Sequence, residues 1–214
     1  MWTGRTEGDL AMAPHRAVPE ATVGRLAGLA GRPVSWLHQV HGDGVVVVPA
    51  GDPEHGRGEN GDALVTSSGT ALAVMTADCA PVALASSEGV VGAVHAGWRG
   101  LVAGVVQAAV AAMHRLGAGR VEAALGPCIH AECYAFGAAE LDLVAARLGA
   151  GVRSELPGGG PALDLPAAVG AALEKAGAEL VHDVDECTAC AGDRYFSHRA
   201  RGERERQAMV VWKA

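Results

Sequence analysis

The sequence has few aromatic residues, few charges and no long apolar run. Only 4% of its 214 residues are aromatic and 19% are charged, and the formal net charge is −7. Because nucleic-acid-binding surfaces are basic, this balance argues against a broad nucleic-acid footprint. Apolar runs such as 45–48 are far shorter than the roughly 20 residues that a membrane-spanning helix needs. We therefore expect neither nucleic acid nor a membrane among the partners.

Small and apolar residues are abundant instead. Half of the chain is hydrophobic and 30 residues are glycine. This length predicts one domain, spanning 1–214, whose core is large enough to need no disulfide. The first 15 residues contain Arg5, Glu7 and Asp9 where a secretory signal needs an apolar stretch. The expected location is the cytoplasm, where five cysteines favour metal or catalytic chemistry over disulfides.

Short Val-, Ala- and Leu-rich runs alternate with helical patterns, which predicts an α/β fold. The predicted strands are 34–40, 45–48, 63–66, 72–75, 90–94, 121–125 and 208–212, with loops at 50–61 and 156–161. The predicted helices are 100–116, 137–148 and 165–176. The last of these helices has Asp164 as its N-cap and Pro166 in its first turn. Because several strands precede the first helix, we expect a mixed sheet.

Residues that could bind a metal or take part in catalysis follow three of the predicted strands. They lie in the motifs HQVHG (38–42), TADCAP (76–81) and HAGWRG (95–100). Sites in open α/β sheets gather at such strand ends. His41, Cys79 and His95 could together bind one transition metal, because a thiolate with two imidazoles suits zinc or copper. Three protein ligands would leave the fourth position open for water, as in catalytic zinc sites.

The same residues permit other interpretations. Cys79 could be the nucleophile and His95 the base of a metal-free cysteine hydrolase, or both could be ordinary core side chains. The second histidine, His41, favours the metal. Arg99 opens a predicted helix between two glycines and could bind an anion there, or it could pair with a carboxylate.

Four cysteines lie in two other motifs. Zinc nucleobase deaminases have an H-x-E motif followed well downstream by P-C-x-x-C. The segment 127–133, PCIHAEC, contains PC before HAE and has four residues between its cysteines, so we reject that fold and expect a turn. The segment 187–190, CTAC, has no second CxxC to complete a zinc site, and an incidental pair in a loop is the favoured interpretation. The run 199–206, RARGERER, mixes both signs and is interpreted as a solvated turn between two strands.

Five motifs occur in one order: HQVHG, TADCAPV, HAGWRG, GPCIHAECYAFG and CTACAGDRYFSHRARGERERQA. Together they resemble the laccase-domain family, also called the polyphenol oxidase or YfiH family, from about residue 36 to the C-terminus. The resemblance implies a three-layer α/β/α fold with a mixed sheet and a metal held by His41, Cys79 and His95. It also implies a purine nucleoside phosphorylase that uses phosphate to cleave adenosine, inosine, guanosine and methylthioadenosine, and that deaminates adenosine.

Roles for further residues follow from that implied activity. Asp78, beside the ligand Cys79, is a candidate catalytic proton shuttle, although it could equally brace a loop. Arg99 is a second candidate catalytic residue, as an anion contact that stabilises the departing purine. The candidate substrate contacts are Arg5, Ser197 and Arg199. We expect zinc as the cofactor, with copper as the alternative, and a monomer or homodimer.

Alternative functions remain. Family members were earlier described as copper-dependent phenol oxidases, and a cell-wall-editing role would suit a metal-free Cys/His hydrolase. A multicopper centre is disfavoured because the chain has nine histidines and no clustered H-x-H pair. A non-catalytic binding module is disfavoured by the exposed-looking cluster of metal ligands. The N-terminus departs from the family, since Glu7 replaces a glycine and the stretch Asp9 to Arg16 is short, which could change substrate preference.

Overall fold

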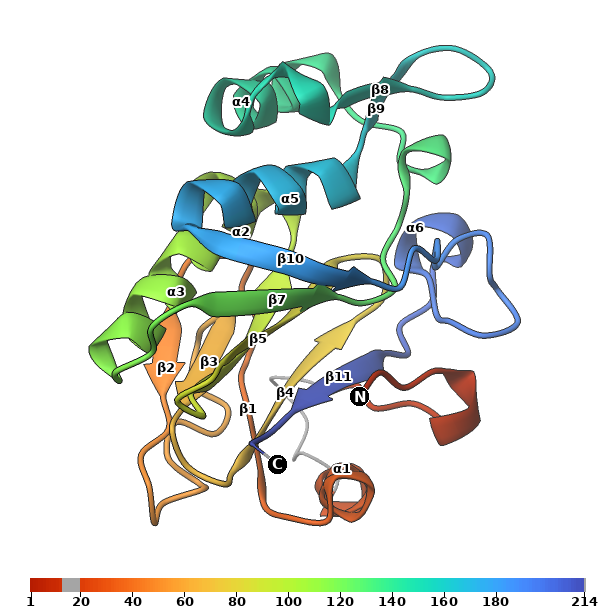
Figure 1. Cartoon of the computed structure of the whole chain (residues 1–214). Coiled ribbons are helices and arrows are strands. Elements are labelled where there is room, and N and C mark those ends of the chain that lie inside the picture. Colours follow the sequence, from red (N-terminus) through yellow and green to blue (C-terminus); the bar gives the residue numbers. More distant parts are fainter. Residues whose placement is uncertain (13–19, 214) are drawn as a thin grey trace.

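The computed structural model describes residues 1–12 and 20–213 (Figure 1). Residues 13–16 of the short N-terminal stretch therefore lie outside the described residues. Within the described part of the chain, every helix is too short or too polar to cross a lipid bilayer.

Two mixed sheets form the centre of the molecule. The larger has the strand order β10 (Ala178–Asp183), β7 (Val121–Leu125), β5 (Ala80–Ser86), β6 (Val91–Ala96), β3 (Ala63–Thr66) and β2 (Val45–Val47). The smaller has the order β1 (Val34–Trp36), β4 (Ala71–Thr76) and β11 (Gln207–Val211). Each sheet combines parallel and antiparallel pairs. A separate antiparallel pair consists of β8 (Arg153–Glu155) and β9 (Pro161–Leu163).

The two sheets pack face to face. Along β3, Ala63 and Val65 face the helices, whereas Leu64 faces the smaller sheet, where it packs in one cluster with Leu72 and Met209. This alternation is the two-residue period of a strand, with both faces buried. Burial on both sides explains why β3, β4 and β6 consist of nearly continuous small apolar runs.

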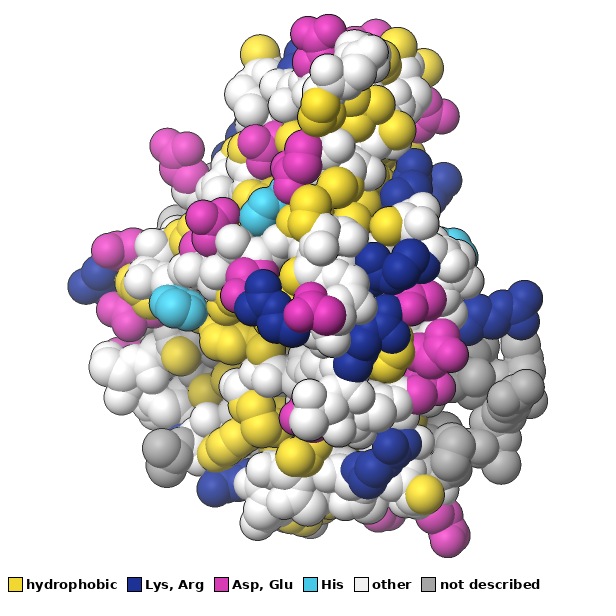
Figure 2. Space-filling model, turned by 90° about the vertical axis from the view of Figure 1, so that its right-hand side faces the viewer, with side chains coloured by type: hydrophobic (Ala, Val, Ile, Leu, Met, Phe, Trp, Pro, Cys, Tyr) yellow, Lys and Arg dark blue, Asp and Glu magenta, His cyan; other side chains and the backbone are white. Residues whose placement is uncertain are grey.

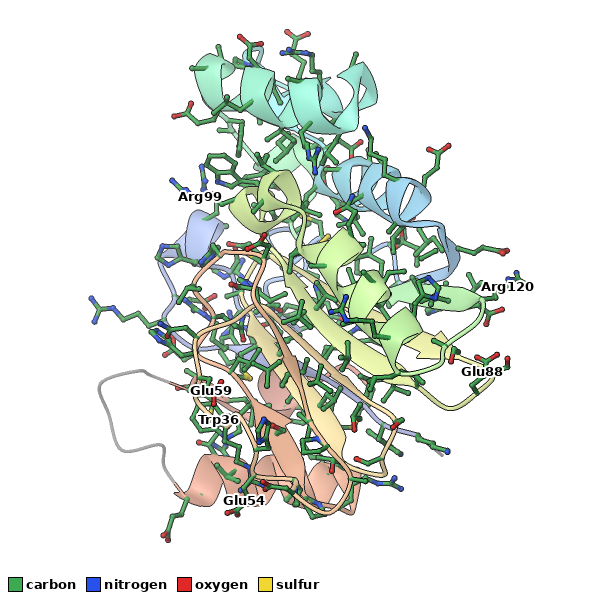
Figure 3. All side chains as sticks on the ribbon, turned by 90° about the vertical axis from the view of Figure 1, so that its left-hand side faces the viewer. Trp36, Glu54, Glu59, Glu88, Arg99 and Arg120 are labelled. Carbon is green, nitrogen blue, oxygen red and sulfur yellow. The ribbon has the colours of Figure 1, made fainter. Side chains whose placement is uncertain are left out.

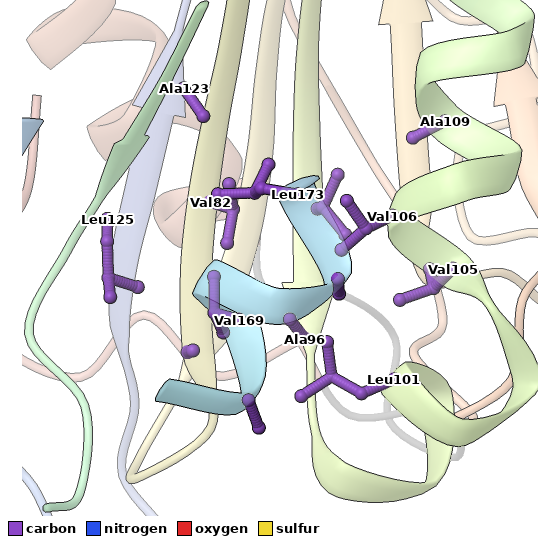
Figure 4. Close-up of a cluster of buried hydrophobic side chains, with 14 of the residues drawn as sticks. Val82, Ala96, Leu101, Val105, Val106, Ala109, Ala123, Leu125, Val169 and Leu173 are labelled. Atoms are coloured by element: carbon purple, nitrogen blue, oxygen red, sulfur yellow. The ribbon is translucent and has the colours of Figure 1, made fainter. Parts of the chain in front are cut away.

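Helices cover the two outer faces of this pair of sheets. On the larger sheet lie α2 (Trp98–Ala103), α3 (Val105–Arg115) and α5 (Leu165–Ala176), with α4 (Ala138–Leu148) outside them. On the smaller sheet lies α1 (Glu20–Ala30), and α6 (His198–Arg201) precedes β11. Within residues 1–12 and 20–213, three single-turn 3₁₀ helices complete the list: η1 (Arg5–Glu7), η2 (Ala131–Cys133) and η3 (Ala150–Val152). In Figure 4, Val106 of α3 and Leu173 of α5 meet Val82 of β5 in the main core.

The predicted α/β class and the mixed sheet in one small domain are confirmed. The structure adds that the strands divide between two stacked sheets, so the layer between the helices is double. The predicted helix 100–116 starts earlier, at Trp98, and is interrupted at Gly104, whose φ of 103° is left-handed. The N-cap Asp164 is confirmed, because its side chain accepts a hydrogen bond from the Ala167 N–H.

Several observed elements were not predicted: α1, β5, β10, the pair β8 and β9, the three 3₁₀ turns, and α6, which begins the run 199–206 that was interpreted as a turn. The first two turns of α1 mix small and polar residues, and β5 begins directly after the TADC motif. β10 is an edge strand whose residues are exposed except for Ala178, so it has no alternating apolar pattern to reveal it.

Candidate metal centre

His41, Cys79 and His95 come from three separate parts of the chain and meet at one place. His41 follows β1, Cys79 lies between β4 and β5, and His95 lies on β6. Their ligand atoms all lie within 4.8 Å of one another, and Cys79 Sγ is 3.8 Å from His41 Nε2. The two imidazole rings meet edge to face, with centroids 4.8 Å apart. The predicted trio is thus a group that could hold one metal ion.

Local backbone geometry makes this meeting possible. His41 has a φ of 60° and Asp78 a φ of 95°, so both lie in left-handed conformations that reverse the chain sharply. Gly97 lies against the group from the start of α2. A Cβ at Gly97 would lie 2.8 Å from His41 Cδ2 and 3.2 Å from Cys79 Sγ, so a side chain at this position would displace the ligands.

Asp62 supports the group from behind. Its fully buried carboxylate lies 2.8 Å from His95 Nδ1 and accepts hydrogen bonds from the backbone N–H groups of His41 and Gly42. Burial opposes ionisation of Asp62, but these hydrogen bonds and the charge of His95 lower its pKa overall. A carboxylate that binds one ring nitrogen orients the imidazole and frees the other nitrogen for a metal.

The electrostatics favour a thiolate at Cys79. Burial opposes its ionisation, but the positive charge of His95 and hydrogen bonds from His41 and His95 lower the thiol pKa to about 6. For His95, burial opposes protonation, but the charge of Cys79 and the contact with Asp62 raise the pKa to about 9. A thiolate is the form that binds metals and also the form that attacks electrophiles.

The trio forms part of the wall of a cavity of about 600 Å³. Three distant segments supply the rest of the lining: 11–12, 37–39 and 75–77, together with His198, Arg204 and Arg206. The interpretation of 199–206 as a solvated turn missed the last two arginines, because their place in a cavity depends on tertiary contacts. His38 and Gln39 were within the HQVHG motif but were not singled out. Gln39 fixes this motif to β4 through hydrogen bonds with the Met75 backbone.

Positive charge near the cavity comes from individual side chains and not from the net charge of the protein. Figure 2 shows the side of the molecule that lies to the right in Figure 1, and there basic and acidic side chains are interspersed without a broad basic patch. With a net charge of −7, the overall field does not attract anions. An anion in the cavity would therefore depend on nearby cations such as Arg204 and Arg206.

Asp78 makes the contacts of a brace. Its two carboxylate oxygens accept hydrogen bonds from Thr188 Oγ1, at 2.8 Å, and from the Arg199 backbone N–H, at 2.6 Å. Asp78 thus connects the Cys79 turn with the loop after β10 and with the start of α6. These contacts match the alternative role in which it holds a loop, and its role as a proton shuttle stays a prediction.

The other predicted site residues do not line the cavity. Arg5 pairs with Glu203, and the buried Ser197 caps α6 by accepting from the Ala200 N–H. Arg99 is exposed and stacks on Trp98, and it projects outward at the start of α2 in Figure 3. Arg199 stacks on Tyr134 and donates to the Ala135 carbonyl. Their roles as substrate contacts stay predictions.

The sequence matches a described family and curated relatives. The family described as multi-copper polyphenol oxidoreductase laccase matches residues 16–214. A purine nucleoside phosphorylase of Streptomyces coelicolor is 44% identical over 187 residues, which cover 84% of this chain and 74% of that protein. A purine nucleoside phosphorylase of Deinococcus radiodurans is 40% identical over 212 residues, which cover 97% of this chain and 79% of that protein.

Solved structures share the fold. A Neisseria meningitidis protein is 33% identical with a TM-score of 0.81, and the match covers 95% of this chain and 86% of that one. YlmD from Geobacillus stearothermophilus is 28% identical with a TM-score of 0.83, covering 95% of this chain and 84% of that one. The Bacillus licheniformis protein YfiH, at 23% identity and a TM-score of 0.85, covers 100% of this chain and 91% of its own and supports the fold alone.

Proposed function

This chain belongs to the multi-copper polyphenol oxidoreductase laccase family, and on that premise we propose that it is a zinc-dependent purine nucleoside phosphorylase that also deaminates adenosine. Its substrates would be phosphate and the nucleosides adenosine, inosine, guanosine and methylthioadenosine. One observation carries the proposal: a single cavity contains the His41, Cys79 and His95 group together with the guanidinium groups of Arg204 and Arg206. Its volume, about 600 Å³, lies in the usual range for small-molecule sites.

The donor set of the trio fits a metal ion. Two imidazoles and one thiolate suit zinc or copper, and a metal-binding histidine usually has its other ring nitrogen held by a carboxylate, as Asp62 holds Nδ1 of His95. When bound, such an ion supplies Lewis-acid chemistry. We favour zinc because three protein ligands with an open fourth position are the arrangement of catalytic zinc.

The donor set fits a multicopper cluster poorly. Within the described residues, two groups could hold a metal, and only the trio contains histidine. Laccase-type three-copper clusters need many histidines close together, so phenol oxidation would have to depend on a single copper. That activity is kept as an alternative, and it is testable with a phenol substrate and copper-loaded protein.

We assign the phosphate end of the cavity to residues before β11. The Arg204 guanidinium makes no hydrogen bond or ion pair within the described residues, and Arg206 and His198 lie on the same cavity wall. Arginine binds phosphate oxygens through paired N–H donors. The apolar side chains of Leu37 and Met75 would contact the purine, which needs little charge complementarity.

A product assay tests the proposal. The full chain, purified without added metal, is analysed for bound metal and then incubated with adenosine, with and without phosphate. Adenine that forms only with phosphate supports phosphorolysis, and inosine supports deamination. A protein that releases neither product with bound zinc and excess phosphate would contradict the proposal.

A metal-free cysteine hydrolase is the second candidate, since Cys79 has a lowered pKa and a histidine 3.8 Å from its sulfur. The two candidates differ in their response to a chelator. Removal of metal abolishes phosphorolysis at the trio, whereas it leaves a Cys/His hydrolase active on cell-wall amide fragments. Thiol alkylation does not distinguish them, because both need Cys79.

A further inference from the structure

A second group of metal-ligating side chains lies away from the cavity. It consists of Glu132, Cys133, Cys187 and Cys190, whose ligand atoms all lie within 4.8 Å of one another. We call it the loop cluster. Two of its members lie in η2, which follows β7, and the other two lie in the turn after β10. β7 and β10 are adjacent parallel strands, so the segments that follow them leave the sheet at the same end (Figure 1).

The distances within the loop cluster suit a shared ion. Cys133 Sγ and Cys190 Sγ are 3.4 Å apart, and Cys190 Sγ is 3.5 Å from a Glu132 carboxylate oxygen. Tetrahedral zinc with Zn–S bonds of about 2.3 Å places two sulfurs roughly 3.8 Å apart. A disulfide needs about 2.05 Å and would use only two of the four side chains. All cysteines of the chain are free thiols here.

The backbone around Cys187 has the features of a thiolate site. The His130 N–H donates to Cys187 Sγ at 3.4 Å, and the Ala191 N–H donates to the Cys187 carbonyl, which closes the turn. An N–H donor to sulfur stabilises the ionised thiol that a metal requires. Cys187 is buried, Cys133 half-buried and Cys190 exposed. The loop cluster is therefore packed against the protein on one side and accessible to a metal ion on the other.

We propose that the loop cluster binds a second metal ion, a structural zinc held by three thiolates and the Glu132 carboxylate. Thiolate-rich sets select zinc among the common divalent ions, and four protein ligands close the coordination shell, which is the pattern of structural sites. The interpretation of CTAC as an incidental pair is thereby replaced, because the fold supplies the missing partners across 57 residues.

This zinc would help to hold the turn that carries Cys79 in place. Thr188, inside the CTAC turn, donates to Asp78, which adjoins Cys79. Tyr134 directly follows Cys133, and the Arg199 guanidinium stacks on the Tyr134 ring. A metal that joins η2 to this turn would therefore fix the turn that contacts Asp78 directly and a second segment that reaches Asp78 through Tyr134 and Arg199.

Metal counting on the full chain tests the second site independently of nucleoside chemistry. The protein is purified under reducing conditions, loaded with zinc, freed of excess metal and analysed for zinc per chain. We expect two zinc ions for the wild type, one for His41→Ala/Cys79→Ala and one for Cys187→Ser/Cys190→Ser. Cys128→Ala is the matched control, because Cys128 is a buried neighbour outside the cluster, and it keeps two.

Cobalt gives a second readout, which reports the number of thiolates bound to the metal. In His41→Ala/Cys79→Ala protein loaded with Co²⁺, three thiolates produce about three times the sulfur-to-cobalt absorption that one thiolate gives in Cys187→Ser/Cys190→Ser protein. If that second variant fails to fold, Glu132→Gln replaces it, and the three-thiolate spectrum persists with a shifted visible band. Equal zinc content in wild-type and Cys187→Ser/Cys190→Ser protein, no cobalt–sulfur absorption without the trio, or a Cys133–Cys190 disulfide in reduced protein overturns the proposal, whereas a wild type with one zinc that this double variant loses would count against the trio's metal instead.

Discussion

The trio and the loop cluster both contain cysteine, yet their surroundings differ. The trio combines one sulfur with two imidazoles, opens into a cavity and has the buried Asp62 behind it. The loop cluster has three sulfurs and one carboxylate, lies on turns, and has backbone N–H support at Cys187. An incomplete ligand set next to a cavity can bind a substrate, whereas a complete set can only hold the chain. The contrast predicts chemistry at one group and stability at the other.

The strongest test of this contrast is to remove one sulfur from each group and to compare the effects on activity and stability. Cys79→Ser is expected to lower kcat/KM for adenosine phosphorolysis by roughly 1000-fold, because it removes a ligand of the Lewis acid. Cys187→Ser is expected to change kcat/KM by less than about 10-fold while lowering the thermal midpoint, since it weakens a structural tie. Steady-state kinetics and thermal melts of both proteins provide the measurement. Equal kinetic losses would show that the two groups share one role.

Thiol reactivity separates the groups in metal-free protein. The pKa of Cys79 is lowered to about 6, whereas the hydrogen bond with Cys133, followed by burial, raises the pKa of Cys190 to about 12. At pH 7, iodoacetamide should therefore modify Cys79 about 100 times faster than the more exposed Cys190. Peptide mass spectrometry over a pH series measures both rates.

The sign of the linked stability follows from the same pKa. Because the folded pKa of Cys79 lies below its ordinary value of 9.0, its ionisation stabilises the metal-free fold. This contribution is complete above pH 9 and is lost as the pH falls through about 6. Faster modification of Cys190 at pH 7 would contradict the assignment of the low-pKa thiol.

Asp62 tests how far the trio depends on its buried support. Asp62→Asn keeps the shape but removes the charge that binds His95 and orients two backbone N–H groups. We expect zinc affinity at the trio to fall by about 10- to 100-fold, with phosphorolysis following it, while the loop cluster keeps its metal. Competition with a chromophoric chelator measures both affinities. Unchanged affinity at the trio would mean that the contact of Asp62 with His95 is only structural.

How well the sequence predicts this site depends on where its signal lies. His41, Cys79 and His95 could be named because each lies in a short motif of metal-ligand residue types after a predicted strand. Asp62 could not, because a carboxylate after an Asn-Gly pair looks like an ordinary turn residue until the fold buries it. The partners of Cys190 were equally hidden, since Cys133 is 57 residues away.

The same reason limits the prediction of the fold. The buried strand β3 was predicted with its observed bounds because its four residues are all apolar or Thr between polar turns. The exposed strand β10 was missed because its sequence, AELVHD, has neither alternation nor a buried run. Periodicity reports burial, so elements and side chains that are buried only by distant segments give no local signal.

Arg204 tests the phosphate end of the cavity, with a smaller expected effect. Arg204→Ala should raise KM for phosphate about 10-fold and leave kcat nearly unchanged, because one charge-assisted contact contributes roughly 1.5–3 kcal/mol at most and this side chain is exposed. Arg115→Ala, which removes an exposed arginine from the end of α3, is the matched control. Phosphate titrations at saturating adenosine make the comparison. If both variants behave like the wild type, phosphate binds elsewhere.

Thr188→Val gives the smallest expected effect, and it addresses the connection between the two regions. Thr188 is fully buried, and its hydroxyl donates to Asp78 at 2.8 Å, so valine keeps the shape and removes one hydrogen bond. The free energy of unfolding should fall by about 1–3 kcal/mol, because Asp78 is left with an unpaired carboxylate oxygen. Activity should fall only 2- to 5-fold, since the ligand atoms of the trio stay in place. If zinc at the loop cluster fixes this turn, the kinetic effect of Thr188→Val grows when the cluster is emptied by Cys187→Ser. Strict additivity of the two substitutions in kcat/KM would show that the regions act independently.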